Sequence, residues 1–196
     1  RAVFSDAAGP RNPDLVATPG IYTKFTWNLS PYLEASFFDP DAPVRGDTGL
    51  RLAARYDVAP GLVLSGSMKH RLAGNLDDIT RRSNSVLPRV RSDIDQYLIQ
   101  GTTALEYLTL SHFARPGTNM YSRITVGYLE RMYGGISTEL LWKPVNSRLA
   151  LGAEVNFVRQ RAFDGGLEFR NYETFTGHVS AYYDFGNGYH AQLDVG

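Results

Sequence analysis

The sequence predicts an all-β protein: an antiparallel up-and-down meander that forms part or all of a transmembrane outer-membrane β-barrel. Three observations lead to this prediction. Several stretches of about ten residues alternate apolar and polar side chains with a period of two, the pattern of a strand with two different faces. Turn signals rich in Gly, Pro and Asn recur between them at fairly even intervals. Tyr, Phe and Gly, with 12, 10 and 19 residues, also favour strands.

The alternating stretches define the elements in order. We predict an N-terminal segment or linker over residues 1–20 and about nine barrel strands over residues 21–196, in a chain cut at both ends and without a helix. In one stretch Leu64 and Met68 fall on one face, whereas Lys69 and Arg71 fall on the other. The clearest stretches are YTKFTWNL (22–29), LVLSGSMKHRL (62–72), SRITVGYLERM (122–132), GISTELLWK (135–143), RLALGAEVNFV (148–158) and ETFTGHVSAYYDF (173–185).

Two kinds of connection alternate along the chain. The first kind is uniformly short and comprises TPG (18–20), APG (59–61), RPG (115–117), KPVN (143–146) and FGNG (185–188). The second kind contains every long loop and comprises DPDAPVRGD (39–47), residues 73–94, YGG (133–135) and QRAFDGGLEF (160–169). Strands joined by short turns pair antiparallel, so one end of the sheet carries short turns and the other the long loops. In outer-membrane barrels the long loops lie on the outer side. We therefore expect the 73–94 loop, which has strand-like flanks, to lie on the outer side or to fold back into the mouth of the barrel.

The two faces favour a membrane barrel over a soluble one. The apolar face is rich in Tyr, Phe and Trp, as is typical of a lipid-facing band with aromatic girdles. The other face holds ions of both signs on nearly every strand, which suits a wet lumen. A lipocalin-like soluble barrel is the alternative, with the apolar face inside and the charges outside, and periodicity alone does not separate the two.

Composition excludes several classes of function. The 20 basic and 20 acidic residues give a net charge of zero, so the chain as a whole has no net electrostatic attraction to nucleic acid or to an acidic surface. With no cysteine, there is no disulfide framework, thiolate metal site or cysteine nucleophile. No apolar run approaches the roughly 18 residues of a transmembrane helix, and the opening residues lack the apolar core of a signal peptide.

Several long segments resemble the YjbH-like exopolysaccharide biosynthesis family of Gram-negative outer-membrane lipoproteins. They are YTKFTWNLSPYLEASFFDPDAPVRGDTG, LSGSMKHRLAGNLDD, SNSVLPRVRSD and ITVGYLERMYGGISTELLWKPVNSRLALGAEVNFVRQRAFD. The resemblance implies an outer-membrane barrel that takes part in making or exporting an extracellular polysaccharide. It implies outer-membrane lipid, the exopolysaccharide and periplasmic proteins of the same secretion pathway as partners. Family members are longer and begin with a lipoprotein signal, so the chain resembles a fragment of the C-terminal barrel region.

Ionic and aromatic side chains on the polar face are the candidate ligand-binding residues. A basic ladder on this face would steer an acidic polysaccharide through the lumen. It consists of Arg51, Arg55, Lys69, Arg71 and Arg123. Alternatively, these residues form cross-strand ion pairs that stiffen the barrel wall. The whole candidate set is Arg51, Arg55, Lys69, Arg71, Glu106, Arg123, Glu139, Glu154, His178 and Tyr182, with Arg81, Arg82, Arg89 and Arg91 in the loop. Tyr22, Tyr97 and Tyr182 are candidates for stacking on sugars, although aromatic residues of barrels more often form the girdle.

Catalytic and metal sites are disfavoured. Glu139 and Glu154 lie on neighbouring strands, as the two acids of a glycosidase would, but each has basic neighbours that favour a structural ion pair. Ser111 and His112 are adjacent, so on a strand they point to opposite faces. No histidine pair or Cys/His cluster has metal-ligand spacing, and the resemblance supplies no catalytic motif, so we expect no enzyme, no metal and no cofactor. We therefore predict polymer passage or docking; the alternatives are a barrel enzyme that modifies the polymer and a soluble carbohydrate-binding barrel.

Overall fold

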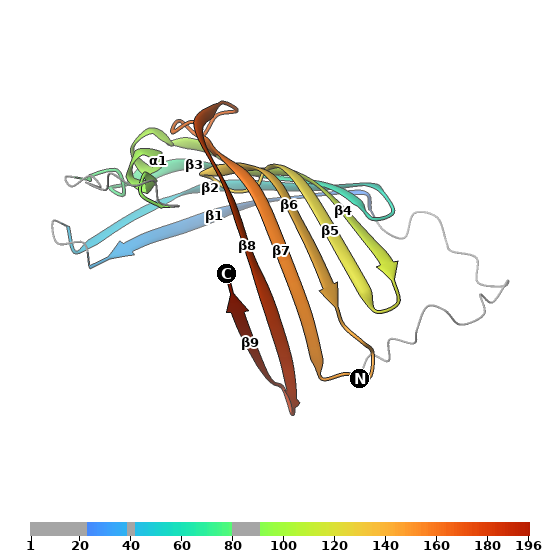
Figure 1. The fold of residues 1–196 in the computed structure, drawn as a ribbon. Coiled ribbons are helices and arrows are strands. Elements are labelled where there is room, and N and C mark those ends of the chain that lie inside the picture. The colour runs from blue at the N-terminus through green and yellow to red at the C-terminus, as the bar shows by residue number, and fades with distance from the viewer. Residues whose placement is uncertain (1–22, 39–41, 80–90) are drawn as a thin grey trace.

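The computed structural model describes residues 23–38, 42–79 and 91–196. Within these ranges nine strands form one antiparallel sheet in which each strand pairs with its neighbours in the sequence. Figure 1 shows a curved sheet, and its edge strands β1 and β9 do not contact each other. The strands are β1 Phe25–Phe37, β2 Val44–Ala59, β3 Leu62–Gly74, β4 Thr103–Gly117, β5 Met120–Tyr128, β6 Tyr133–Trp142, β7 Leu149–Arg161, β8 Phe169–Gly186 and β9 Tyr189–Val195. The meander is confirmed; its closure into a barrel stays a prediction.

The two ends of the sheet carry the two kinds of connection, as the turn signals predict. At the short-turn end, Gly61, Asn119 and Asn187 have positive φ angles of 77°, 60° and 53° in the tight turns that join β2–β3, β4–β5 and β8–β9. Gly and Asn tolerate this left-handed conformation better than other residues, so these positions end one strand and start the next within two residues. The opposite end, called the loop end here, carries the connections after β1, β3, β5 and β7.

Strand register aligns the apolar residues into rows that cross the sheet. One row runs through eight strands and consists of Phe25, Tyr56, Leu64, Leu110, Val126, Ile136, Phe157 and Phe175. Its members stay exposed: Leu64 is 40% accessible, Val126 38% and Phe175 73%. A contiguous apolar surface of this extent is unusual for a soluble monomer and marks a contact surface.

The other face is the hollow side of the sheet and holds the polar side chains. Ser67, Lys69 and Thr109 are 3%, 6% and 8% exposed, and a groove of about 480 Å³ lies over β3 to β8 on this face. In these strands the apolar row is exposed, whereas a soluble barrel would enclose it. The predicted division of the sheet into an apolar face and an ionic face is confirmed, and the orientation of these faces in a closed barrel stays a prediction.

The expectation of a chain without helices is wrong, because α1 spans Ile94–Gln100 in the connection between β3 and β4. Ile94, Tyr97 and Leu98 are spaced three and four residues apart, which places them on one side of a helix, and Tyr97 is buried. Gly101 ends the helix, and its amide donates to the Tyr97 carbonyl at 3.1 Å. The stretch before Gly101 that the sequence presents as a strand-like flank is thus helical. No helix in the described ranges is long and apolar enough to cross a membrane.

The packed core of the described chain lies at the loop end. Tyr97 from α1, Met132 from the β5–β6 connection, Tyr133 and Val158 form one buried cluster. Leu129, Phe163 and Tyr172 pack against it. Segments far apart in the sequence therefore meet here, and we call this assembly of α1 with the β5–β6 and β7–β8 connections the cap.

Candidate functional site

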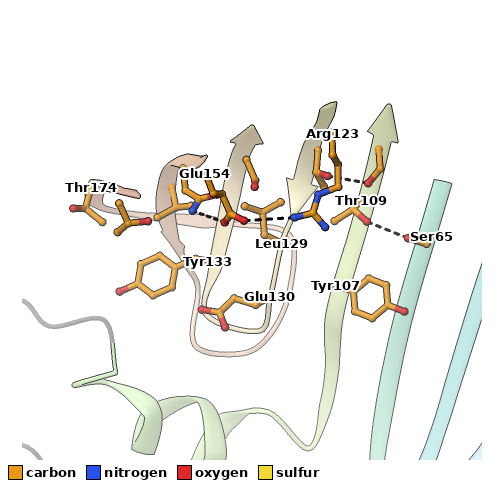
Figure 2. Close-up of a pocket in the computed structure, with 15 residues that line it drawn as sticks. Ser65, Tyr107, Thr109, Arg123, Leu129, Glu130, Tyr133, Glu154 and Thr174 are labelled. Carbon is orange, nitrogen blue, oxygen red and sulfur yellow. Dashed lines mark hydrogen bonds and ion pairs between the residues drawn. The ribbon is translucent and has the colours of Figure 1, made fainter. Parts of the chain in front are cut away.

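A groove lies on the hollow face, and its walls come from six strands and the β5–β6 connection (Figure 2). Polar side chains dominate the walls, and Leu129 and Glu130 border it at the cap. Tyr107 and Tyr133 lie on opposite sides in Figure 2. The lining residues are Ser65, Tyr107, Thr109, Ser111, Arg123, Thr125, Leu129, Glu130, Tyr133, Ser137, Glu154, Asn156, Val158, Thr174 and Thr176.

A row of uncharged polar side chains crosses the middle of this groove. Strand register places Ser111, Thr125, Ser137, Asn156 and Thr176 directly opposite one another on β4 to β8. The hydroxyls of Ser111 and Thr125 are 3.0 Å apart. Each hydroxyl can donate once and accept twice, so the row retains hydrogen-bonding capacity beyond its internal contacts.

A charged row lies beside the uncharged one, two residues along each strand. Arg123, Glu139, Glu154 and His178 face one another in sequence across β5 to β8. The Arg123 guanidinium lies 2.8 Å from the Glu139 carboxylate and 3.6 Å from that of Glu154. Glu154 also accepts a hydrogen bond from Asn156 at 2.9 Å. One cation therefore neutralises part of two carboxylates at the edge of the groove.

Further ion pairs link β1 to β4 on the same face. Arg51 on β2 reaches across β3 and donates two hydrogen bonds of 2.7 Å to Glu106 on β4. Ser67 donates to the same carboxylate at 2.7 Å. Lys69 on β3 forms an ion pair with Glu34 on β1, although its side chain is only 7% exposed. A bidentate Arg–carboxylate pair with a further donor is a strong, geometrically fixed interaction.

The loop end of this face carries a pair between a strand and the following connection. Arg71 donates to Asp77 at 2.7 Å and lies 3.5 Å from Asp47. The hydrogen bond from Arg71 lowers the pKa of the Asp77 carboxyl below its ordinary value. The Asp47 carboxylate also accepts from the Leu76 amide at 3.0 Å, so it holds the start of the connection against the sheet.

The structure brings together only part of the predicted set. Arg51, Lys69, Arg71, Glu106, Arg123, Glu139 and Glu154 share the hollow face and are paired with opposite charges, as the charge-pairing alternative describes. Arg55 lies towards the short-turn end, 3.0 Å from Asp57. Tyr182 lines a separate hollow of about 420 Å³ with Lys143 and Arg148. Arg81, Arg82, Arg89 and Tyr22 lie outside the described residues, whereas Arg91 pairs with Glu130 at 2.9 Å.

The structure shows how the residues of the two catalytic alternatives are arranged. Glu139 and Glu154 are direct cross-strand partners bridged by Arg123, the arrangement of a structural ion pair. Ser111 lies on the hollow face against Thr125, whereas His112 lies opposite Leu62 and Ile124 on the apolar face, so they point apart as predicted. Tyr97 is 0% exposed, which removes it as a platform for a sugar.

Arg161 fixes the cap, and sequence analysis gave it no role. Its side chain is 0% exposed, and its guanidinium lies 4.8 Å from the centre of the Tyr128 ring. Four backbone carbonyls accept hydrogen bonds of 2.7 to 3.1 Å from it, namely those of Leu105, Glu130, Gly165 and Gly166. One side chain thus ties β4 to the β5–β6 and β7–β8 connections.

Tyr97 couples α1 to the same point. Its hydroxyl donates to the Arg161 carbonyl at 2.5 Å, and burial raises the pKa of Tyr97 to about 12. Arg131 donates to the Tyr97 carbonyl, and burial lowers the pKa of Arg131 from its ordinary value. Arg161 is the last residue of β7. The period-two pattern of a strand predicts which face a side chain occupies, but it does not predict which backbone carbonyls that side chain contacts.

Comparison with known proteins identifies relatives. The chain matches the model of the family YjbH, described as "Exopolysaccharide biosynthesis protein YbjH", over residues 4–196. It is 30% identical over 167 residues to a protein of Escherichia coli (strain K12) named "Uncharacterized lipoprotein YjbH". That match covers 82% of this chain and 24% of the relative, so the chain spans about a quarter of the relative's length. No solved structure matches.

Proposed function

Because the chain belongs to the YjbH exopolysaccharide biosynthesis family, we propose that it forms part of an outer-membrane β-barrel that takes part in making or exporting an extracellular polysaccharide. In this proposal the barrel guides or docks the polymer and performs no bond chemistry. The named relative is a lipoprotein, which supports attachment of the whole protein to a membrane. Outer-membrane lipid, the polysaccharide and periplasmic proteins of the same secretion pathway are its partners.

One observation carries the membrane part of the proposal. The apolar row through eight strands is exposed on the outside of the curve, while the ionic side chains line the hollow side in pairs. Hydrocarbon favours the first surface, and a wet lumen favours the second. With this orientation the cap lies on the outer side, because outer-membrane barrels have short turns on the periplasmic side.

Site-directed spin labelling tests the orientation, and the chain is suited to it because it contains no cysteine. Val126→Cys and Thr125→Cys place a label on adjacent residues of β5, whose side chains lie on opposite faces. In the full-length protein in liposomes, with no other free cysteine, we expect molecular oxygen to relax the label at 126 more strongly. A water-soluble nickel chelate should relax the label at 125 more strongly. Equal water accessibility at both sites would contradict a membrane-spanning sheet.

Docking and passage are separated by conductance. The cap packs over the loop end of the hollow face, and its residues Leu129 and Glu130 border the groove, which favours docking while the cap is in place. Planar bilayers that contain the full-length protein should show low conductance that rises when the cap is released by Arg161→Ala. High conductance of the unaltered protein, blocked by the polysaccharide of the producing cell, would favour passage instead.

A further inference from the structure

We propose that the groove on the hollow face binds an uncharged stretch of polysaccharide; this inference rests on the proposed function and names the chemical class of its substrate. The basic ladder would suit an acidic polymer only if its cations were free to meet the polymer's carboxylates. In the structure, Arg51, Lys69, Arg71 and Arg123 each lie within 3.6 Å of a carboxylate oxygen of the protein. An acidic chain would have to displace these partners to gain any attraction.

The net charge of the groove lining also disfavours an acidic polymer. Its lining contains one cation, Arg123, and two carboxylates, Glu130 and Glu154. Glu139 adds a third carboxylate next to Arg123, while Arg91 compensates Glu130 from outside the groove. A polymer that carries a carboxylate or sulfate on each repeat meets a weakly negative wall, which disfavours like charge.

The neutral row supplies contacts that sugar hydroxyls can use. Ser111, Thr125, Ser137, Asn156 and Thr176 lie on successive strands, and neighbouring strands are about 4.8 Å apart. Hydroxyl and amide groups both donate and accept, as do the hydroxyls of an uncharged sugar. The row therefore offers a repeating, charge-free set of partners to a repeating, charge-free polymer.

Two groups in the groove wall have no partner among the described residues. They are the Tyr133 hydroxyl and the Arg123 Nε, both of which are shielded from solvent. Buried polar atoms are nearly always satisfied in folded proteins, so we expect both atoms to gain a partner when a small shift of the groove wall admits a ligand hydroxyl. Tyr107, which is partly exposed in the groove wall, also presents an aromatic ring with an apolar body to a sugar face.

Binding of defined oligosaccharides to the full-length protein in nanodiscs, followed by calorimetry, tests the inference. The probes are uncharged maltodextrin, dextran and cellulose oligomers, acidic oligogalacturonate and hyaluronan oligomers, and cationic chitosan oligomers, all of matched length. We expect at least one uncharged oligomer to bind, and every charged oligomer to bind about tenfold more weakly. An acidic or cationic oligomer that binds more tightly than all uncharged ones, or no uncharged oligomer bound, overturns the inference.

Variants link the binding to the groove. Tyr133→Phe keeps the ring and its packing but removes the unpaired hydroxyl, and it should weaken binding of the uncharged probe about three- to tenfold. Ser122→Ala is the matched control, because Ser122 lies on β5 but on the apolar face, and it should leave affinity unchanged. Glu139→Gln with Glu154→Gln frees Arg123 and should raise affinity for oligogalacturonate more than tenfold. Unchanged affinities in both groove variants would overturn the assignment of the site.

Failure of this inference can be distinguished from failure of the proposed function. If the spin labels place β5 in the membrane and no uncharged oligomer binds, the inference fails while the outer-membrane proposal stands. If the labels show water on both faces, the proposed function fails, and a binding result then reports on a soluble sugar-binding sheet.

Discussion

The loop end and the short-turn end of the sheet differ in how their side chains are held. At the loop end, α1 and two connections bury Tyr97, Met132 and Arg161, each 0% exposed. At the short-turn end, the ion pair of Arg55 and Asp57 has side chains that are 56% and 44% exposed, and Trp142 is 40% exposed. The comparison teaches that a buried tertiary core stabilises one end, while turn geometry, strand pairing and exposed side-chain contacts hold the other.

Arg161→Ala is expected to have the largest effect on the difference in stability between the two ends. It removes the donor for four carbonyls at once, and leaving buried acceptors unsatisfied costs about 3 kcal/mol or more. Hydrogen exchange should accelerate in α1 and in residues 161–168, while the short-turn end stays unchanged. Arg159→Ala, two residues away and bonded to one carbonyl, is the control and should have a small effect. Equal acceleration at both ends would contradict the separate stabilisation of the cap.

Between the two ends, the stability of the strands should depend more on whether lipid or water surrounds them than on packing within the sheet. Val126→Arg places a charge on the exposed apolar row, and in a membrane it is expected to cost about 2–4 kcal/mol. Thr125→Arg, on the hollow face, is the matched control for size and charge, and should cost less. Urea titration of the full-length protein in liposomes measures both. Equal costs would remove the distinction between the faces.

High pH should narrow the difference in stability between the two ends. The pKa of Tyr97 is raised from 10.0 to about 12 by burial, so the folded cap keeps this proton at a pH at which the unfolded cap releases it. Cap stability is therefore lost as pH rises through this window, by about 1 kcal/mol between about pH 9 and about pH 11. Tyr97→Phe should lose this part of the pH dependence, which hydrogen exchange of α1 measures, and an unaltered pH slope in that variant would contradict the assignment.

The smallest effect is expected at the short-turn end. Asp57→Asn breaks the exposed ion pair with Arg55, and such pairs contribute about 0–1 kcal/mol. Denaturant midpoints of the variant and the unaltered protein should agree to within about 0.5 kcal/mol. A larger loss would show that the short-turn end has energetic organisation of its own.

The sequence predicted what depends on local periodicity. Alternation in the stretch around Leu64 and Lys69 assigned the two faces, and Gly61 and Asn187 marked turns, because side-chain direction and turn conformation are set by neighbours along the chain. The family was also recognised from long segments, and the match over residues 4–196 confirms it. Strand existence, face and order are thus accessible without a structure.

What the sequence could not predict depends on register. Glu106 was expected on the polar face, but its bidentate partner Arg51 lies 55 residues earlier and on a strand two places away. The uncharged row through Ser111, Thr125 and Ser137 exists only because three strands align at those residues. A one-residue slip would invert each face, and alternation alone does not fix the offset between strands. The helix was missed because the stretch was interpreted with the period of its neighbours.

The open edges of the meander have a consequence for how a cylinder can form. In the nine described strands, β1 and β9 are both odd members of an antiparallel series, so both run from the short-turn end towards the loop end. Joined directly, they would lie parallel to each other. A ring in which every neighbour runs in the opposite direction needs an even number of members, so an odd number of additional strands must stand between β1 and β9 before this arc can close.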